Sequence, residues 1–483
     1  MRSKEVTLDP ENWQKVKDLG HQMLEDLMVN LETIRKHPYQ PPTEETKKAI
    51  QTPLPLKGDG EEKVYNIFKN HIVPSSSIFI RPNFWSGVGG SGSPFGMLTD
   101  MAISGINTGS IFMFFITNQA LDWIKELLEY PMEAGGVFVA SGSEANYTGL
   151  AVARNAKAEI NMKTEGMQAV PRRMTLYCSE EAHHCLERSS ELLGLGNDAL
   201  RWIKTDKDRR INLDSLSASI KDDRKQGYHP FCVIGTAGTV NSGTFDDLYG
   251  LADLCKKEDL WFHVDGAFGS WVKLSETHKH LVDGLECADS LAVDLHKWMS
   301  MPFGIACTLV KDRLAHYSTF VYGHEAEYLK TGKELSGERV TNPLDLSLAL
   351  SRPDYGLKAY MLLRAYGIEK YSKLVQQNID QIHYLAELVN NESSLEMSVP
   401  VVSNIACFRY VHDGLSEVDL ESLNRGILLE LLGGARGMFN DTKIKGKHTL
   451  RVCNVNHRTT CSDFDLLVER IISTGDKLVT EYL

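Results

Sequence analysis

The sequence has no Cys-x-x-Cys pair and no long apolar run. Its nine cysteines are scattered and odd in number, which is typical of reduced core thiols in a cytosolic protein. The segment from Met1 to Trp13 is polar and charged, so we expect no signal peptide. No stretch is apolar enough to span a bilayer. These absences predict a cytoplasmic protein without a membrane partner.

Basic residues are also too few for a nucleic-acid-binding protein. The 52 Lys and Arg residues stand against 64 Asp and Glu residues, which gives a net charge of −12. This balance argues against nucleic acid or an anionic membrane as the main partner, although a local basic pocket for one phosphate stays open. The length of 483 residues is enough for two or three domains. We find no internal repeat and no low-complexity tract.

A formal G-x-G-x-x-G pattern occurs at Gly87, Gly89 and Gly92, but the context of a dinucleotide site is missing. Pro94 interrupts the expected continuation, no clear acidic residue follows at ribose distance, and no βαβ unit surrounds the glycines. We therefore interpret 81–94 as a loop that lines a pocket, where glycines leave room for a ligand.

From about Gly135 onward, short apolar runs alternate with helical segments. We predict strands over 136–140, 173–177, 200–203, 231–236, 260–264, 290–293 and 305–310. Helical segments at 147–155, 215–225 and 248–256 lie between several of them. Such alternation predicts an α/β fold with a mainly parallel, seven-stranded sheet covered on both faces. Functional residues are then expected in the loops after the strands.

The two ends of the chain have other patterns. Residues 19–34 carry an amphipathic helical stripe followed by a Pro-rich arm, which must pack on another domain or another subunit to bury its apolar side. A long helical pattern at 360–388 precedes strands at 405–410 and 449–455 and a helix at 463–478. We predict an N-terminal helical arm (1–95), a large domain (96–355) and a small C-terminal α/β domain (356–483).

Residues 140–146, which include Gly142 and Ser143, follow a predicted strand and open a helix. Small residues at such a position let backbone N–H groups and hydroxyls reach an anion, which a helix N-terminus also favours. An ordinary serine N-cap, formed by Ser141 or Ser143, explains the same residues and stays open as the alternative.

Other polar side chains follow later strands. His183 can stack on a flat heteroaromatic ring or can be an ordinary, partly exposed histidine; no partners at metal-ligand spacing are apparent. Thr236 ends one predicted strand, and Asp265 is the first charge after the next, so its carboxylate should be buried and need a cation or several donors. A protonated pyridine nitrogen is one suitable cation.

Lys297 lies between His296 and Trp298, just after the predicted strand 290–293. Strands of open α/β sheets collect ligands at this carboxyl edge. A lysine held among apolar groups there can be desolvated, which lowers its pKa and makes it a nucleophile that forms imines. A snorkelling surface lysine beside a satisfied histidine is the alternative.

Taken in order, these features resemble a pyridoxal-phosphate (PLP) enzyme of fold type I, in the group II amino-acid decarboxylase family. That family includes aromatic-L-amino-acid, histidine and glutamate decarboxylases. The resemblance runs from about Leu19 to the C-terminus. It is strongest at 141–146, 182–183, 263–267 and 296–298, and 450–460 also resembles a C-terminal family pattern.

The resemblance implies a role for each matching residue. Lys297 would form the internal aldimine, Asp265 would keep the pyridine nitrogen protonated, and His183 would stack over the ring. The remaining implied contacts are to the phosphate, from Gly142, Ser143 and His296, and to the ring, from Thr236 and Ala267. It also implies a homodimer with active sites at the subunit interface, and an amino-acid substrate that is decarboxylated through a quinonoid to the corresponding amine.

The sequence departs from the family pattern at two places. Glycines in 81–94 stand where aromatics often line the substrate pocket. The family's catalytic loop tyrosine matches Pro343, and neither Tyr322 nor Tyr328 can be placed at that position. The alternatives are therefore oxidative deamination to an aldehyde, transamination, or carbon–carbon lysis on a phosphorylated amino alcohol. A fourth is a binding protein that has lost activity, against which the intact Lys297 and Asp265 argue.

Overall fold

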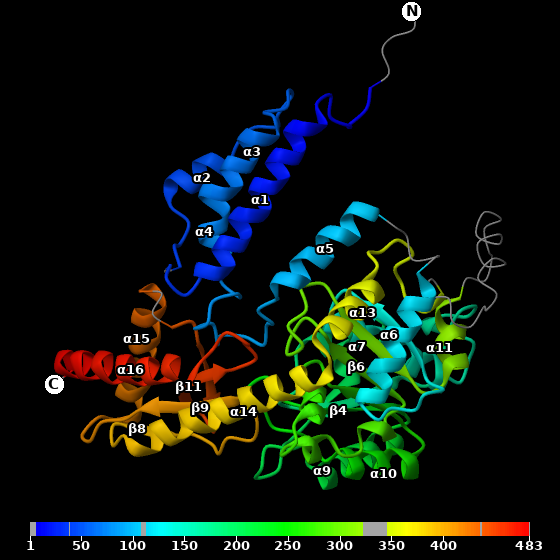
Figure 1. Ribbon diagram of the computed structural model, residues 1–483. Coiled ribbons are helices and arrows are strands. Elements are labelled where there is room, and N and C mark those ends of the chain that lie inside the picture. The colour runs from blue at the N-terminus through cyan, green and yellow to red at the C-terminus, as the bar shows by residue number, and fades with distance from the viewer. Residues whose placement is uncertain (1–5, 38, 108–112, 322–344, 435–436, 483) are drawn as a thin grey trace, which may run out of the picture.

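The computed structural model describes residues 6–37, 39–107, 113–321, 345–434 and 437–482. Figure 1 shows a large body built around one sheet, a smaller sheet beside it, and a group of N-terminal helices that protrudes from both. The large sheet has seven strands in the order β1-β7-β6-β5-β4-β2-β3. The prediction of a seven-stranded α/β sheet is confirmed.

All seven predicted strands are present, and no end differs from its predicted position by more than two residues. Their bounds are β1 (Gly135–Val139), β2 (Met174–Ser179), β3 (Leu200–Ile203), β4 (His229–Thr236), β5 (Trp261–Asp265), β6 (Ser290–Asp294) and β7 (Ala306–Val310). β7 runs antiparallel to its neighbours β1 and β6, whereas β2, β3, β4, β5 and β6 pair in parallel. The predominance of parallel strands is therefore also confirmed.

Successive side chains of β5 point to opposite faces of the sheet, as the period of a strand requires. Phe262 and Val264 pack into the core that includes α9 (Leu213–Lys225) and α10 (Leu248–Glu258). Trp261 packs into the core on the side of α7 (Gly142–Lys157). His263 and Asp265 therefore face α7. This alternation decides which side of the sheet receives the polar residues.

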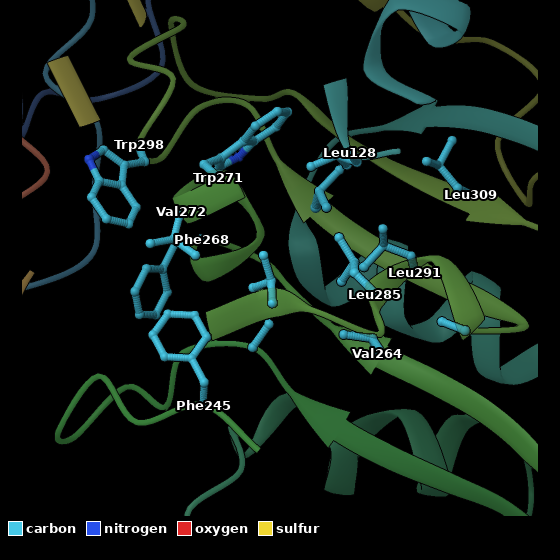
Figure 2. Close-up of a cluster of buried hydrophobic side chains, with 14 of the residues drawn as sticks. Leu128, Phe245, Val264, Phe268, Trp271, Val272, Leu285, Leu291, Trp298 and Leu309 are labelled. Carbon is cyan, nitrogen blue, oxygen red and sulfur yellow. The ribbon is translucent and has the colours of Figure 1, made fainter. Parts of the chain in front are cut away.

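The segment after β6 is held in place by two buried tryptophans. Figure 2 shows Trp271 and Trp298 in one apolar cluster with Phe268, Val272 and side chains of β5, β6 and β7. Each indole N–H also has an acceptor, because Trp271 donates to the Asp294 carbonyl at 2.8 Å and Trp298 donates to Asn378 Oδ1 at 3.1 Å. Burial of one such indole contributes on the order of 5 kcal/mol of transfer free energy. Residues 294–298, which include Lys297, are therefore held at both ends by these tryptophans.

Several helices of the large body were not predicted. They are α5 (Pro94–Ile106), α6 (Phe114–Leu127), α8 (Cys185–Leu192) and α11 (Arg313–Phe320), with short 3₁₀ turns at Met167–Ala169, Asn197–Ala199, Gly269–Leu274, Lys279–Val282 and Leu285–Cys287. The prediction that Pro94 interrupts the continuation into a helix was wrong. Pro94 begins α5, with Ser93 as the N-cap, because proline fits the first helical turn. The glycine segment before it follows no strand, so rejection of a dinucleotide fold still stands.

The smaller sheet is antiparallel, with strand order β10-β11-β9-β8. Its strands are β8 (Leu395–Met397), β9 (Ile405–Tyr410), β10 (Asn440–Ile444) and β11 (Lys447–Cys453), accompanied by α14 (Ile368–Asn391), α15 (Glu417–Gly433) and α16 (Cys461–Tyr482). The predicted strand 405–410 and helix 463–478 are confirmed, and the strand predicted at 449–455 is β11. The sequence patterns missed β8, β10 and α15.

The helix predicted over 360–388 is in fact two helices. α13 (Tyr355–Tyr366) ends at Gly367, whose φ of +70° is left-handed, and α14 begins at the next residue. α13 packs on α5 and α6 of the large body, whereas α14 packs on β8, β9 and α16. Apolar periodicity runs through both helices, so only the glycine marked the break. The domain limits at 95 and 355 stay predictions.

The N-terminal segment contains α1 (Trp13–Thr33), α2 (Glu44–Ile50), α3 (Glu61–Ile67), a short π-helix (Phe68–Ile72) and α4 (Val73–Ser76). The amphipathic helix predicted over 19–34 is α1, which begins earlier because Asn12 caps it. None of the side chains of α1 is buried in the single chain. Within the described ranges, no helix combines the length and apolarity needed to cross a membrane.

Candidate active site

A cavity of about 270 Å³ opens where β4, β5 and β6 end and where α7 and α8 begin. Its position at the carboxyl ends of parallel strands is where α/β sheets bind ligands. All eight residues predicted for the site line it, namely Gly142, Ser143, His183, Thr236, Asp265, Ala267, His296 and Lys297. The structure therefore brings together residues that lie as much as 155 positions apart in the sequence (297 − 142).

Lys297 reaches into this cavity from the turn after β6. Its Nζ lies 2.9 Å from Oδ2 of Asp294, a residue whose side chain is only 1% exposed. Burial alone would lower the pKa of Lys297, but the Asp294 carboxylate outweighs it and raises that pKa above its ordinary value. Our prediction of a lowered pKa was wrong, because it considered burial alone and left out the carboxylate of Asp294, the last residue of β6.

Asp294 is the main functional residue that the sequence analysis did not assign. Besides Lys297, it faces His296, whose Nε2 lies 3.8 Å from the same Oδ2. A Cβ at Gly142 would lie 2.6 Å from Asp294 Oδ2 and 2.7 Å from Oδ1, so only glycine leaves room for this carboxylate. Asp294 and Lys297 are three residues apart, and that spacing of opposite charges was the available clue.

Asp265 is the last residue of β5 and is 6% exposed, as predicted for a buried carboxylate at a strand end. Its Oδ1 accepts a hydrogen bond from the backbone N–H of Ala267 at 3.2 Å. The nearby Lys297 and His296 pair with Asp294 instead, and no ion pair joins Asp265 to a basic side chain among the described residues. Asp265 is thus a buried acid suited to a cation that enters the cavity.

The N-terminus of α7 forms another wall. Ser141 is its N-cap, since its hydroxyl accepts from the Glu144 N–H at 3.3 Å, so the capping interpretation is confirmed for Ser141. Gly142 and Ser143 form the first turn and line the cavity, where free N–H groups of a helix N-terminus favour an anion. The cap and an anion site are compatible, because the cap uses the Ser141 hydroxyl and the Glu144 N–H, whereas Gly142 and Ser143 face the cavity.

His183 lies at the mouth of the cavity, just before α8. Its Nδ1 accepts a hydrogen bond from the Cys185 N–H at 3.1 Å, and burial lowers the pKa of His183. Because Nδ1 accepts this hydrogen bond, it carries no proton, and with the lowered pKa the imidazole is neutral near pH 7. The Thr236 N–H donates to Asp246 Oδ2 at 2.8 Å, which fixes the end of β4.

The glycine loop lies directly on the lysine segment. The Gly90 N–H donates to the His296 carbonyl at 3.0 Å, and a Cβ at Gly90 would lie 2.3 Å from the Lys297 carbonyl oxygen. Val88, two residues earlier, lines the cavity. The predicted loop thus reaches the cavity through Val88. Gly90, however, makes room for the Lys297 backbone and not for a ligand, because the two backbones touch there.

The family model for the pyridoxal-dependent decarboxylase conserved domain matches residues 42–411, which are 370 of the 483 residues. The chain belongs to the pyridoxal-dependent decarboxylase family. It is a PLP-dependent carboxy-lyase by family membership, as the resemblance implied.

Named relatives span almost the whole of this decarboxylase. An aromatic-L-amino-acid decarboxylase of Bacillus atrophaeus is 27% identical, covering 97% of each chain. A phenylacetaldehyde synthase of Arabidopsis thaliana is 25% identical, covering 92% of each chain. A solved TDC of Oryza sativa, with PLP and tryptamine, matches with a TM-score of 0.90 and 23% identity over 98% of this chain and 100% of that one. The last match supports the fold alone.

The cavity of this decarboxylase fits pyridoxal phosphate. It offers an amine for the aldehyde (Lys297), a buried acid for the ring nitrogen (Asp265), a flat imidazole (His183) and a helix N-terminus for the phosphate. Thr236 Oγ1, on the wall, has no hydrogen-bond partner among the described residues. The missing side chain of Gly142 leaves space beside the Asp294 carboxylate. Tyr322, Tyr328 and Pro343, which bear on the loop acid, lie outside the described residues.

Asn146 and Cys185 also line the cavity, and the sequence analysis assigned neither. Asn146 lies one turn into α7, and Cys185 begins α8. Both follow predicted site residues by two to four positions, and that proximity was the only sign of their position. Among the described residues, no group of three or more His, Cys, Asp or Glu side chains is arranged to hold a metal ion.

Proposed function

We propose that this protein decarboxylates an L-amino acid to the corresponding amine, with PLP attached to Lys297. The observation that carries this proposal is that Lys297, Asp265 and His183 meet in one cavity of about 270 Å³ with Gly142 and Ser143 at its helix N-terminus. Bound PLP would supply an electron sink for the negative charge left on the substrate's α-carbon when carbon dioxide departs. The other steps depend on the side chains of the chain itself.

Lys297 and Asp294 act as a pair in this proposal. The Lys297 ammonium must lose a proton before its nitrogen can act as a nucleophile. Asp294 Oδ2, at 2.9 Å, holds the charged form of the side chain, so the proton must leave to a stronger base, such as the free amine of an amino-acid substrate. Since Asp294 also raises the pKa of Lys297, it holds the side chain in the cavity while the lysine is charged.

Asp265 and His183 would orient the group bound between them. Asp265 presents a buried carboxylate at the end of β5, where it would keep a ring nitrogen protonated through a charge-assisted hydrogen bond. His183 presents a neutral imidazole whose Nδ1 is already bound to the Cys185 N–H. The flat face of that ring is therefore free to cover a heteroaromatic ring.

A panel of common L-amino acids, scored for carbon dioxide and amine, tests this proposal. We expect equal amounts of carbon dioxide and amine from at least one of them. Aromatic amino acids come first in the panel, because a relative that is 27% identical is named for them. Carbon dioxide release that depends on added PLP and is accompanied by amine supports the proposal; peroxide without amine contradicts it.

Oxidative deamination to an aldehyde is the second candidate. The relative named phenylacetaldehyde synthase, 25% identical over 92% of each chain, favours it. In that reaction, molecular oxygen accepts two electrons and water supplies the aldehyde oxygen, and the products are carbon dioxide, an aldehyde, ammonia and hydrogen peroxide. The same panel, with aldehyde and peroxide also measured, separates the two candidates by stoichiometry.

We also propose a homodimer. α1 carries apolar side chains that stay exposed in the single chain, including Trp13, Val16, Met23 and Val29, and Figure 1 shows its helical group projecting from the body. An unpartnered amphipathic helix is expected to pack on a second chain. Light scattering should give twice the chain mass of 54.1 kDa. A monomer at micromolar concentration would contradict the proposal.

A cytoplasmic location is the last part of the proposal. All nine cysteines lie among the described residues as free thiols, and six of them are buried. Reduced thiols of this kind suit a reducing compartment. Fractionation of the source cells tests the assignment.

A further inference from the structure

A chain of hydrogen bonds runs behind the cavity, from β5 to α8. Trp261 Nε1 donates to Ser290 Oγ at 2.8 Å, and Ser290 Oγ lies 2.7 Å from His263 Nδ1. On the other side of the imidazole, His263 Nε2 lies 2.8 Å from Asn146 Oδ1. Asn146 Nδ2 then donates to Cys185 Sγ at 3.6 Å. Five side chains are thus linked without interruption.

The middle of this chain is shielded from water. His263 and Ser290 are 0% exposed, and Asn146 is 1% exposed. A Cβ at Gly149 would lie 2.7 Å from His263 Cε1, so a glycine of α7 makes room for the imidazole. Buried polar groups of this kind are costly unless every one has a partner, so the chain's completeness matters for the fold of the site.

The donor and the acceptor of each hydrogen bond at His263 can be assigned. Burial lowers the pKa of His263 to about 4, so the imidazole is neutral near pH 7 and carries one proton. Asn146 Oδ1 can only accept, which places that proton on Nε2 and leaves Nδ1 to accept from the Ser290 hydroxyl. The reverse direction would leave the Ser290 proton without an acceptor among its contacts in the described residues. His263 is therefore held as the Nε2–H tautomer.

The linked residues belong to the elements that carry the active-site groups. His263 precedes Asp265 by two residues on the same face of β5, and Ser290 begins β6, which leads to Lys297. Asn146 lies in α7, one turn after Gly142. Cys185 begins α8, and its N–H fixes His183 Nδ1.

We propose that His263 and Asn146 are positioning residues, which hold the walls of the PLP cavity in register through this hydrogen-bond chain. The inference rests on the proposed function and deepens it, since it concerns the same cavity. Neither side chain needs to touch a reacting atom. Asn146 reaches the wall itself, whereas His263 acts through Asn146.

The test uses Asn146→Leu in the full-length protein. Leucine has a similar volume but cannot accept from His263 or donate to Cys185, so a buried N–H loses its partner. We expect the PLP dissociation constant to rise about 10- to 100-fold, measured by fluorescence quenching, since unpaired buried donors have effects of that size. We also expect the visible circular dichroism of the bound cofactor to weaken, because that signal reports how the ring is held.

Asn424→Leu is the matched control. Asn424 is 0% exposed and makes three hydrogen bonds to the backbone of Leu420 and Tyr410, in the smaller sheet region away from the cavity. Its loss should lower the free energy of unfolding while the PLP dissociation constant and dichroism stay within about twofold of wild type.

His263→Gln, whose amide can both accept and donate, should bind PLP at least about threefold more tightly than His263→Leu.

The outcomes separate this inference from the proposed function. A wild-type protein that binds no PLP overturns both. A wild type that binds PLP, with Asn146→Leu unchanged or no worse than Asn424→Leu, overturns only the positioning role. If Asn146→Leu does not fold, Ser290→Ala provides the second test, because it removes the hydroxyl that joins Trp261 to His263 and with it two of the four hydrogen bonds. The dichroism should still weaken, and an unchanged signal in that variant overturns the inference.

Discussion

Lys297→Ala should lower amino-acid decarboxylation by about 10³-fold or more, because it removes the group proposed to attach the cofactor. In the structure, Lys297 Nζ is held 2.9 Å from Asp294 Oδ2 inside the cavity, and it is the lysine that lines the cavity together with Asp265 and His183. The measurement is kcat for carbon dioxide release with saturating PLP.

Lys297→Arg is the control for charge. Arginine keeps a cation beside Asp294 but stays protonated in proteins, so it cannot act as a nucleophile. We expect it to fold better than Lys297→Ala, which leaves the buried Asp294 carboxylate without its partner, and to be equally inactive. A Lys297→Arg protein with activity near wild type would show that the ion pair, and not covalent attachment, is what Lys297 provides.

Asp265→Asn should lower kcat by about 10²- to 10³-fold, the size of effect found when one preorganised electrostatic contact to a developing charge is removed. The carboxylate is 6% exposed and has no ion-pair partner among the described residues, so it is available to a protonated ring nitrogen. Asparagine keeps the shape and the hydrogen bond from Ala267 but carries no charge. The PLP dissociation constant should rise by a smaller factor than the factor by which kcat falls.

Asp223→Asn is the matched control for that variant. Asp223, on α9, is also buried, at 5% exposure, but it pairs with Arg201 of β3 and Tyr177 of β2, away from the cavity. Its replacement should lower the free energy of unfolding, on the order of 3 kcal/mol for a broken buried pair, and leave kcat unchanged. Equal losses of kcat in both variants would mean that Asp265 acts through stability alone.

Much of the fold could be predicted because its cues are local. Parallel strands such as β6 are short apolar runs, and the first polar residue after each run marks the carboxyl edge of the sheet. That rule placed Asp265 and Thr236 at one edge. After β6 the rule marks Asp294, and Lys297 follows three residues later. The same rule could not place Asn146, since a helix interior residue has no such marker.

The failures have physical causes too. Apolar periodicity continues through Gly367, so α13 and α14 looked like one helix until the left-handed φ was known. Pro94 looked like an interruption, although proline at the first helical position is favourable. The pKa of Lys297 was predicted to be lowered because only burial was considered, whereas the carboxylate of Asp294, three residues earlier, raises it.

The most direct test of the account is to find where the cofactor is attached. The purified protein should show a visible absorption band that borohydride abolishes, because reduction makes the attachment to the lysine permanent. Mass spectrometry of the digested, reduced protein should then find the added pyridoxyl group on Lys297, in the peptide that also contains Asp294 and His296. A band that persists in Lys297→Ala, or a pyridoxyl group on any other lysine, would contradict the assignment of this cavity as the active site.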